Sequence, residues 1–360
     1  MNKKLLFLFT LLGLLFNVSC NQPPAFERSS FLENYAHNIV LPSIENVVQM
    51  AHNLQKTTNN LDEKRDAESL KLAQSAWDQA YSAWLKVKLL NFGPGGPEGR
   101  RRTILEEVGL WPVDVVGIEE KIQTGDFKLN DAKRNTRGLL AAEYLLFEET
   151  PAGILQSPEI DKRLDYLNLI IEKLVLQLDE LQKAWQNDYL STFLQNEGTE
   201  VKSSTTLMFN EMVRCFESLR DVQLGIPMGL IAGQSGPQPE LAEARFSKNS
   251  LKYLLAGYEN LISFWEGKKH TGEDGIGWEE YLLSVEGGPA LVENIRSRLA
   301  KIDDIIDRIP QDQNFELLAV NDDPALTEFY HELKELTPYF KGASSSLLSL
   351  AITFSSGDGD

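Results

Sequence analysis

The segment 137–147 combines helical periodicity with a group that could do chemistry. Leu140, Glu143, Tyr144 and Phe147 follow one another at i, i+3, i+4 and i+7, so they share one face of a predicted helix. Glu143 therefore projects from a stripe that is otherwise apolar. A buried carboxylate is costly unless it meets a cation, a hydrogen-bond donor or a metal. Glu143 either makes a structural salt bridge or hydrogen bond, or it lines a binding site.

The sequence lacks the common catalytic motifs. It has no His-Glu-x-x-His pair, no phosphate-binding glycine loop and no Gly-x-Ser-x-Gly elbow. No two of the four histidines lie at ligand spacing; they are His37, His52, His270 and His331. A zinc site rich in histidine is therefore not expected, and no catalytic residue is assigned.

The elements that must position Glu143 are helices. Thr136 is expected to cap the helix that carries it. Regular apolar stripes at helical spacing cover 251–265 and 291–306, and Pro338 should kink or break the last helix. No segment shows the alternation of a β-strand between turn signals. Because long amphipathic helices must pair to bury their stripes, the sequence predicts an all-α fold of two packed four-helix bundles.

A glycine near residue 200, in Asn196-Glu197-Gly198, suggests the boundary between the bundles. The first bundle would then cover 31–200 and the second 201–360. The N-terminus is typical of a targeting segment, since two lysines precede an apolar stretch at 5–16.

Val18-Ser19-Cys20 resembles a lipobox, which predicts a signal peptide over 1–19 and a lipid on Cys20. Asn17 stands where many lipoboxes have leucine, so ordinary cleavage without a lipid is the alternative. Residues 20–30 would form a polar tether, and the lipid would hold the protein on a membrane that it does not cross.

Composition limits the classes of partner. The formal net charge is −18, which disfavours nucleic acid as a ligand because phosphates would be repelled. Hydrophobic residues make up 42% of the chain, enough for a large core. After Cys20 only Cys215 remains, so no internal disulfide can form and Cys215 is expected to be a buried, inert thiol.

Several short motifs together resemble the imelysin family. That family is marked by Gly-x-His-x-x-Glu followed by Tyr-Leu-Leu, and this chain has Gly138, Leu140 in the histidine position, Glu143 and then Tyr144-Leu145-Leu146. Other matches follow in order along the chain: Ile39-Val40-Leu41-Pro42, Ala76-Trp77-Asp78-Gln79-Ala80-Tyr81, Asn91-Phe92-Gly93-Pro94, Trp111-Pro112-Val113-Asp114 and Arg245-Phe246-Ser247-Lys248-Asn249-Ser250. The resemblance covers roughly residues 31–360.

The resemblance implies an envelope protein in iron or haem uptake, tethered by its lipid to the outer membrane, on the periplasmic face or at the cell surface. Its ligand would be iron, haem or another divalent metal, and its partner an outer-membrane iron or haem receptor or transporter. Glu143 and Gly138 carry over from the motif, Glu143 also as a metal ligand. Asp114, Glu119 and Trp111 precede the motif helix and are expected to line the same cleft.

Leu140 has no lone pair, so the resemblance does not supply a full set of zinc ligands. The favoured function is therefore a non-catalytic binding protein. Two alternatives remain: a zinc-type metallopeptidase, which some members of the family were held to be, and a scaffold lipoprotein for an outer-membrane receptor.

Overall fold

The computed structural model describes residues 26–99, 103–129 and 131–353, and these residues contain no β-strand. The predicted signal peptide over 1–19 and the lipidation site Cys20 lie outside the described residues. The α-helices are α1 (Arg28–Glu33), α2 (Leu41–Lys64), α3 (Ala67–Val87), α4 (Ile104–Val108), α5 (Val115–Thr124), α6 (Leu139–Phe147), α7 (Pro151–Leu155), α8 (Ile160–Ala184), α9 (Leu190–Gln195), α10 (Ser204–Glu217), α11 (Ile226–Met228), α12 (Ser250–Trp265), α13 (Trp278–Leu283), α14 (Gly288–Ile306), α15 (Phe315–Val320), α16 (Pro324–Pro338) and α17 (Ser344–Leu347).

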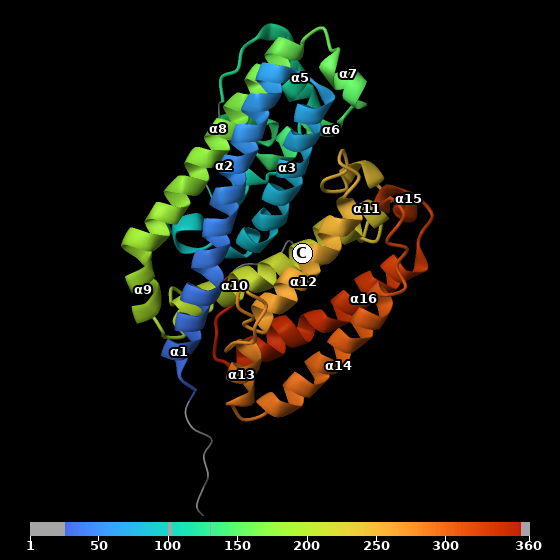
Figure 1. The fold of residues 1–360 in the computed structure, drawn as a ribbon. Helices are drawn as coiled ribbons and strands as arrows, with labels where there is room; N and C mark the ends of the chain where they lie inside the picture. The colour runs from blue at the N-terminus through green and yellow to red at the C-terminus, as the bar shows by residue number, and fades with distance from the viewer. Residues whose placement is uncertain (1–25, 100–102, 130, 354–360) are drawn as a thin grey trace, which may run out of the picture.

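The long helices form two bundles that lie against each other (Figure 1). The first contains α2, α3, α6 and α8, and the second contains α10, α12, α14 and α16. The predicted all-α fold of two packed helical bundles is therefore confirmed. The boundary near residue 200 stays a prediction.

Most helix ends follow from local sequence. Asp66 and Ser69 form a capping box at the start of α3, because each side chain bonds the other's backbone N–H. Gly267 follows α12 with a φ of 67°, a conformation that glycine adopts without strain. Pro338 is the last residue of α16, but the chain does not leave the helical path there: it passes directly into the π-helical turn Tyr339–Ala343.

In the described part of the chain, four π-helical turns join neighbouring helices into longer rods, which the periodicity did not indicate. They cover Asn34–Val40, Trp185–Tyr189, Ser218–Gly225 and Tyr339–Ala343. Such turns shift the register of a helix face, and they are frequent at functional sites. The turn at 218–225 lies beside the contact between the bundles.

The chain enters the fold earlier than the predicted tether allows. Residues 28–30 already belong to α1, and the ring of Phe26 stacks on Tyr281 with centroids 4.3 Å apart. Phe31 packs edge-on against Trp278 at 4.9 Å. Burial of aromatic rings stabilises this attachment, so the first helix packs on the second bundle. Within the described ranges, no helix is long and apolar enough to cross a membrane.

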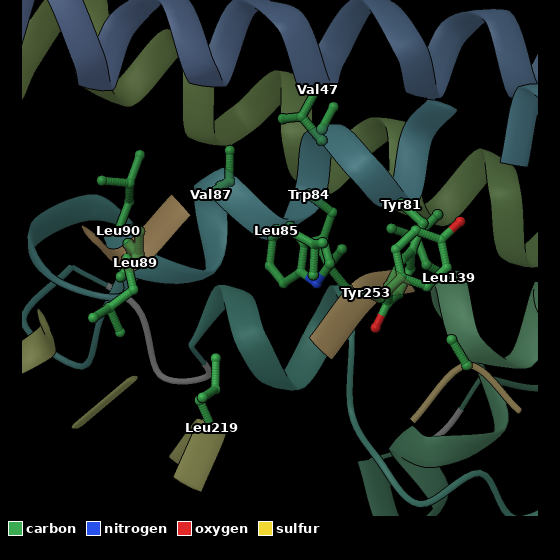
Figure 2. Close-up of a cluster of buried hydrophobic side chains, with 14 of the residues drawn as sticks. Val47, Tyr81, Trp84, Leu85, Val87, Leu89, Leu90, Leu139, Leu219 and Tyr253 are labelled. Carbon is green, nitrogen blue, oxygen red and sulfur yellow. The ribbon is translucent and has the colours of Figure 1, made fainter. Parts of the chain in front are cut away.

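The hydrophobic core runs through both bundles. Figure 2 shows Trp84 and Leu85 of α3, with Val47 of α2 on one side and Leu219 from the second bundle on the other. Tyr81 of α3 packs against Tyr253 of α12, with ring centroids 4.5 Å apart. The buried apolar side chains belong to one connected cluster, so polar groups at the junction of the bundles are desolvated.

Candidate functional site

The helix that carries Glu143 is buried on nearly every side. Glu143 is only 1% exposed, although α6 offers no charged neighbour to balance it. The expected cap by Thr136 is wrong, because its hydroxyl donates to the carbonyl of Lys133 instead. Gly138 occupies the position before the helix, with a φ of 84°. A glycine is needed there, since a Cβ would lie 2.4 Å from the carbonyl oxygen of Val108.

The partner of Glu143 comes from the second bundle. Its Oε1 accepts a hydrogen bond of 2.7 Å from the backbone N–H of Ser247, in the loop that precedes α12. Burial raises the pKa of the Glu143 carboxyl to about 7, and the bond from Ser247 acts in the opposite direction. The Glu143 carboxyl therefore keeps its proton to a higher pH than an exposed glutamate does.

A second carboxylate from the same loop lies nearby. Glu243 accepts a hydrogen bond from the hydroxyl of Tyr81 and forms a 2.7 Å ion pair with Lys88, both on the α3 side of the junction. Burial, then the charge of Glu243 and then that of Glu143 raise the pKa of Tyr81 well above its ordinary value. Carboxylates and phenols of both bundles thus meet in one polar cluster within the apolar junction.

A cleft adjoins this cluster. Its volume is about 200 Å³, and it lies between the end of α3 and the α10–α12 face of the second bundle. The charged groups Lys88, Arg214, Glu243 and Glu106 line it together with Trp111. Most of the remaining lining is apolar: Leu85, Leu89, Leu105, Leu110, Leu219, Val222 and Leu261. An apolar cavity with a few polar groups is typical of a ligand site.

The sequence matches relatives over most of its length. The sequence profile of the imelysin family matches residues 40–338. The chain belongs to the imelysin family. The iron-regulated protein A of Synechococcus elongatus is 22% identical over 264 residues, which are 71% of this chain and 68% of that protein.

Two solved structures share the imelysin fold with this chain. One is described as a putative iron-regulated protein A precursor from Parabacteroides distasonis, with a TM-score of 0.74 and 17% identity over 91% of this chain and 97% of that one. The other is an imelysin-like protein from Psychrobacter arcticum, with a TM-score of 0.69 and 16% identity over the same shares of the two chains. The imelysin resemblance inferred from the short motifs is confirmed.

This imelysin chain departs from the family motif at Leu140. The leucine is 1% exposed and packs in the core. In the described ranges, no three His, Cys, Asp or Glu side chains lie close enough together to hold a metal ion. Because a zinc site needs three or four such ligands, the residues present do not fit a resident zinc ion.

The other residues that the sequence predicted lie in different surroundings. Trp111 lines the cleft. Asp114 caps α5, where its Oδ1 accepts from the N–H of Gly117 at 2.8 Å. Glu119 accepts from the hydroxyl of Tyr144 at 2.8 Å and from Arg163 at 2.9 Å. The structure thus gives Asp114 and Glu119 structural partners, while Trp111 lies beside the cluster that Glu143 joins.

Residues on both sides of the junction were missed by the sequence analysis. Glu243, Lys88 and Tyr81 complete the cluster, and none of them was assigned a role. Two matches to the family gave a signal: the match at 76–81 contains Tyr81, and the match at 245–250 contains Ser247. Residues so far apart in sequence meet only after the bundles have packed.

Cys215 should be slow to react in the folded protein. Cys215 is half-buried in the wall of the cleft and not fully buried as expected, but its Sγ lies 3.5 Å from the carbonyl oxygen of Lys88, and desolvation raises the pKa of the thiol to about 12. Because the thiolate is the nucleophile, alkylation by iodoacetamide at mildly alkaline pH should be at least about a hundredfold slower than in the denatured chain. The measurement uses a chain that begins at Asn21, so that Cys215 is its single thiol. Similar rates in the two states would contradict the inertness.

Proposed function

We propose that this protein is an envelope-anchored, non-catalytic binding protein in iron or haem acquisition, and that the cleft between its bundles receives the ligand. The observation that carries the proposal is the continuity of the cleft with the polar cluster, since Glu243 belongs to both. The name of the Synechococcus elongatus relative, an iron-regulated protein, supports the link to iron.

The lining favours iron held in an organic ligand over a bare ion. A bare ion needs several carboxylate, imidazole or thiolate ligands, and the two carboxylates of the cluster already accept bonds from Ser247, Tyr81 and Lys88. The leucines and Trp111 offer an apolar surface, while the cations in the lining, Lys88 and Arg214, pair with Glu243 and Glu211 and could also bond an anionic group of a ligand. An apolar ligand with anionic groups, such as haem, matches both features, and a cleft of about 200 Å³ would enclose only one edge of the macrocycle.

The predicted lipid at the N-terminus would place the protein at a membrane. A lipid on Cys20 would hold the protein at the outer membrane, and the polar segment after it would leave the bundles free to meet an outer-membrane receptor or transporter. The scaffold role becomes the preferred function if the cleft binds no small ligand.

Titration of the purified chain with hemin, and separately with ferrous and ferric iron, tests the proposal. Hemin should bind saturably, change its absorbance and raise the melting temperature, because a ligand that binds only the folded state stabilises it. The iron salts should produce no comparable stabilisation. Absence of any effect at hemin excess would remove the proposal.

Gly257 provides a matched pair of variants for the same experiment. It lies on α12 in the cleft wall, and a Cβ there would make only ordinary contact with Leu219 at 3.4 Å. Gly257→Ala should therefore fold with up to about 1 kcal/mol greater stability and still bind, because alanine favours helix more than glycine does. Gly257→Leu should fill the cleft and weaken hemin binding at least about tenfold. Unchanged binding by Gly257→Leu would show that the ligand sits elsewhere.

A further inference from the structure

A second, smaller cavity lies at the other side of the bundle junction. Its volume is about 100 Å³, and Leu89 lines both this cavity and the larger cleft. Its walls come from both bundles: Ser43 of α2 and Lys86 of α3 face Asn260 and Ser263 of α12 and His270 of the following loop. It shares none of the carboxylates of the polar cluster around Glu143.

One buried hydrogen-bonding atom of this cavity has no protein partner in the described part of the chain. The Nδ1 atom of His270 is buried and makes no hydrogen bond within the described residues. Ser43 is only 3% exposed, whereas Asn260, Ser263 and Lys86 are half-buried, and all four line the cavity. Buried polar groups are normally satisfied, so the unpartnered Nδ1 atom of His270 indicates that a water molecule or a ligand occupies the cavity.

The charge of the cavity is positive although the whole chain is acidic. Lys86 has no ion-pair partner within the described ranges, whereas Lys268 and Lys269 on the rim pair with Glu266 and Glu273 at 2.5 Å and 3.2 Å. No carboxylate from the described residues lines the cavity. The ammonium of Lys86 is the charge that acts on the His270 ring, and together with burial, the larger effect, it lowers the pKa of that ring.

We propose that this cavity binds a small tetrahedral oxyanion of the phosphate type, held by Lys86, His270, Ser43, Asn260 and Ser263. A cation is excluded by the ammonium and the absence of carboxylates among the described lining residues, and a neutral ligand would leave Lys86 uncompensated. The four oxygens of a tetrahedral anion can accept bonds from several donors at once. A volume of about 100 Å³ suits one such anion and is too small for a nucleotide.

The binding would also join the bundles, because the donors belong to α2, α3, α12 and the loop after α12. The loop is already fixed to the first bundle's end by a 2.7 Å hydrogen bond from the backbone N–H of His270 to the carbonyl of Asn38. Replacement of the His270 side chain leaves that backbone bond in place, so its variants are expected to fold.

Inorganic phosphate is the probe for the experiment, measured by calorimetry and by the ring signals of the four histidines in NMR spectra. Phosphate should bind saturably with one site per chain and shift the His270 signals, while His52 and His331 serve as internal references. Sulfate should compete, and chloride at equal ionic strength should not. Binding that chloride abolishes at equal ionic strength, or no saturable binding, would overturn the proposal.

Variants distinguish phosphate binding in this cavity from non-specific attraction of phosphate to positive charge on the protein. Lys86→Met and His270→Ala should each weaken phosphate binding at least about tenfold, because each removes a charged or buried donor. Lys71→Met removes the same charge from an exposed position on α3 and should leave binding unchanged. Equal effects of Lys71→Met and Lys86→Met would refute the assignment. Glycerol 3-phosphate should bind more weakly than inorganic phosphate. Equal or tighter binding would contradict the proposal that the ligand is a free anion and would favour a phosphate ester.

Discussion

The Glu143→Gln variant should lose much of the pH dependence of folding stability that the wild type shows between mildly acidic and mildly alkaline pH. The pKa of the Glu143 carboxyl is raised from 4.5 to about 7 in the folded protein. The fold therefore binds this proton more tightly than the unfolded chain does. Stability from this group is fully present below about pH 4.5 and falls as the pH rises through about 7.

The size of the effect follows from the two pKa values. Above pH 7 the ionised, buried carboxylate should cost about 3 kcal/mol relative to its protonated form. A glutamine carbonyl can still accept from the Ser247 N–H but carries no charge, so Glu143→Gln should be the more stable protein at about pH 8 and lose that advantage at about pH 5.

Denaturant unfolding of the wild type and of Glu143→Gln between about pH 5 and about pH 8 gives their free energies of unfolding. A residual slope is expected in the variant, because burial also raises the pKa of Glu211 to about 7. The informative quantity is therefore the difference between the two curves. Parallel curves would mean that Glu143 is not desolvated in the junction, and the role of the polar cluster would have to be abandoned.

Gly138→Ala should be among the most destabilising single substitutions in the chain, with a loss of about 3 kcal/mol or more. Gly138 has φ 84° and ψ −169°, a region open almost only to glycine. A Cβ would also lie 2.4 Å from the carbonyl oxygen of Val108, a backbone atom that cannot move aside alone. The start of α6 would shift, and Glu143 would shift with it.

Gly125→Ala is the matched control. Gly125 also has a positive φ, 70°, but no atom lies within 4 Å of the position that its Cβ would take. Backbone strain alone should cost this variant about 1 kcal/mol. Denaturant unfolding at fixed pH compares the two, and similar losses would show that close packing against Val108 is unimportant.

Local patterns in the sequence accounted for the helices. The stripes at 251–265 and 291–306 correspond to α12 and α14, and Pro338 marks the change from α16 to a π-helical turn. Apolar spacing and the missing N–H of proline act over a few neighbouring residues. Both can therefore be recognised in the sequence without knowing which other helix packs against the segment. Thr136 shows where this fails, because a positive-φ glycine sets the start of α6 once Val108 packs against it.

The amino-acid sequence alone was enough to predict an all-helical protein that resembles imelysins. It also predicted that Glu143 lies on an apolar helix face. What that carboxylate meets became visible only in the packed molecule: the N–H of Ser247, 104 residues further along the chain, with Glu243 close by. The same packing brings Lys86 and His270 to one cavity. The difference arises because periodicity specifies which face of a helix is buried, whereas the partner of that face depends on how two bundles pack.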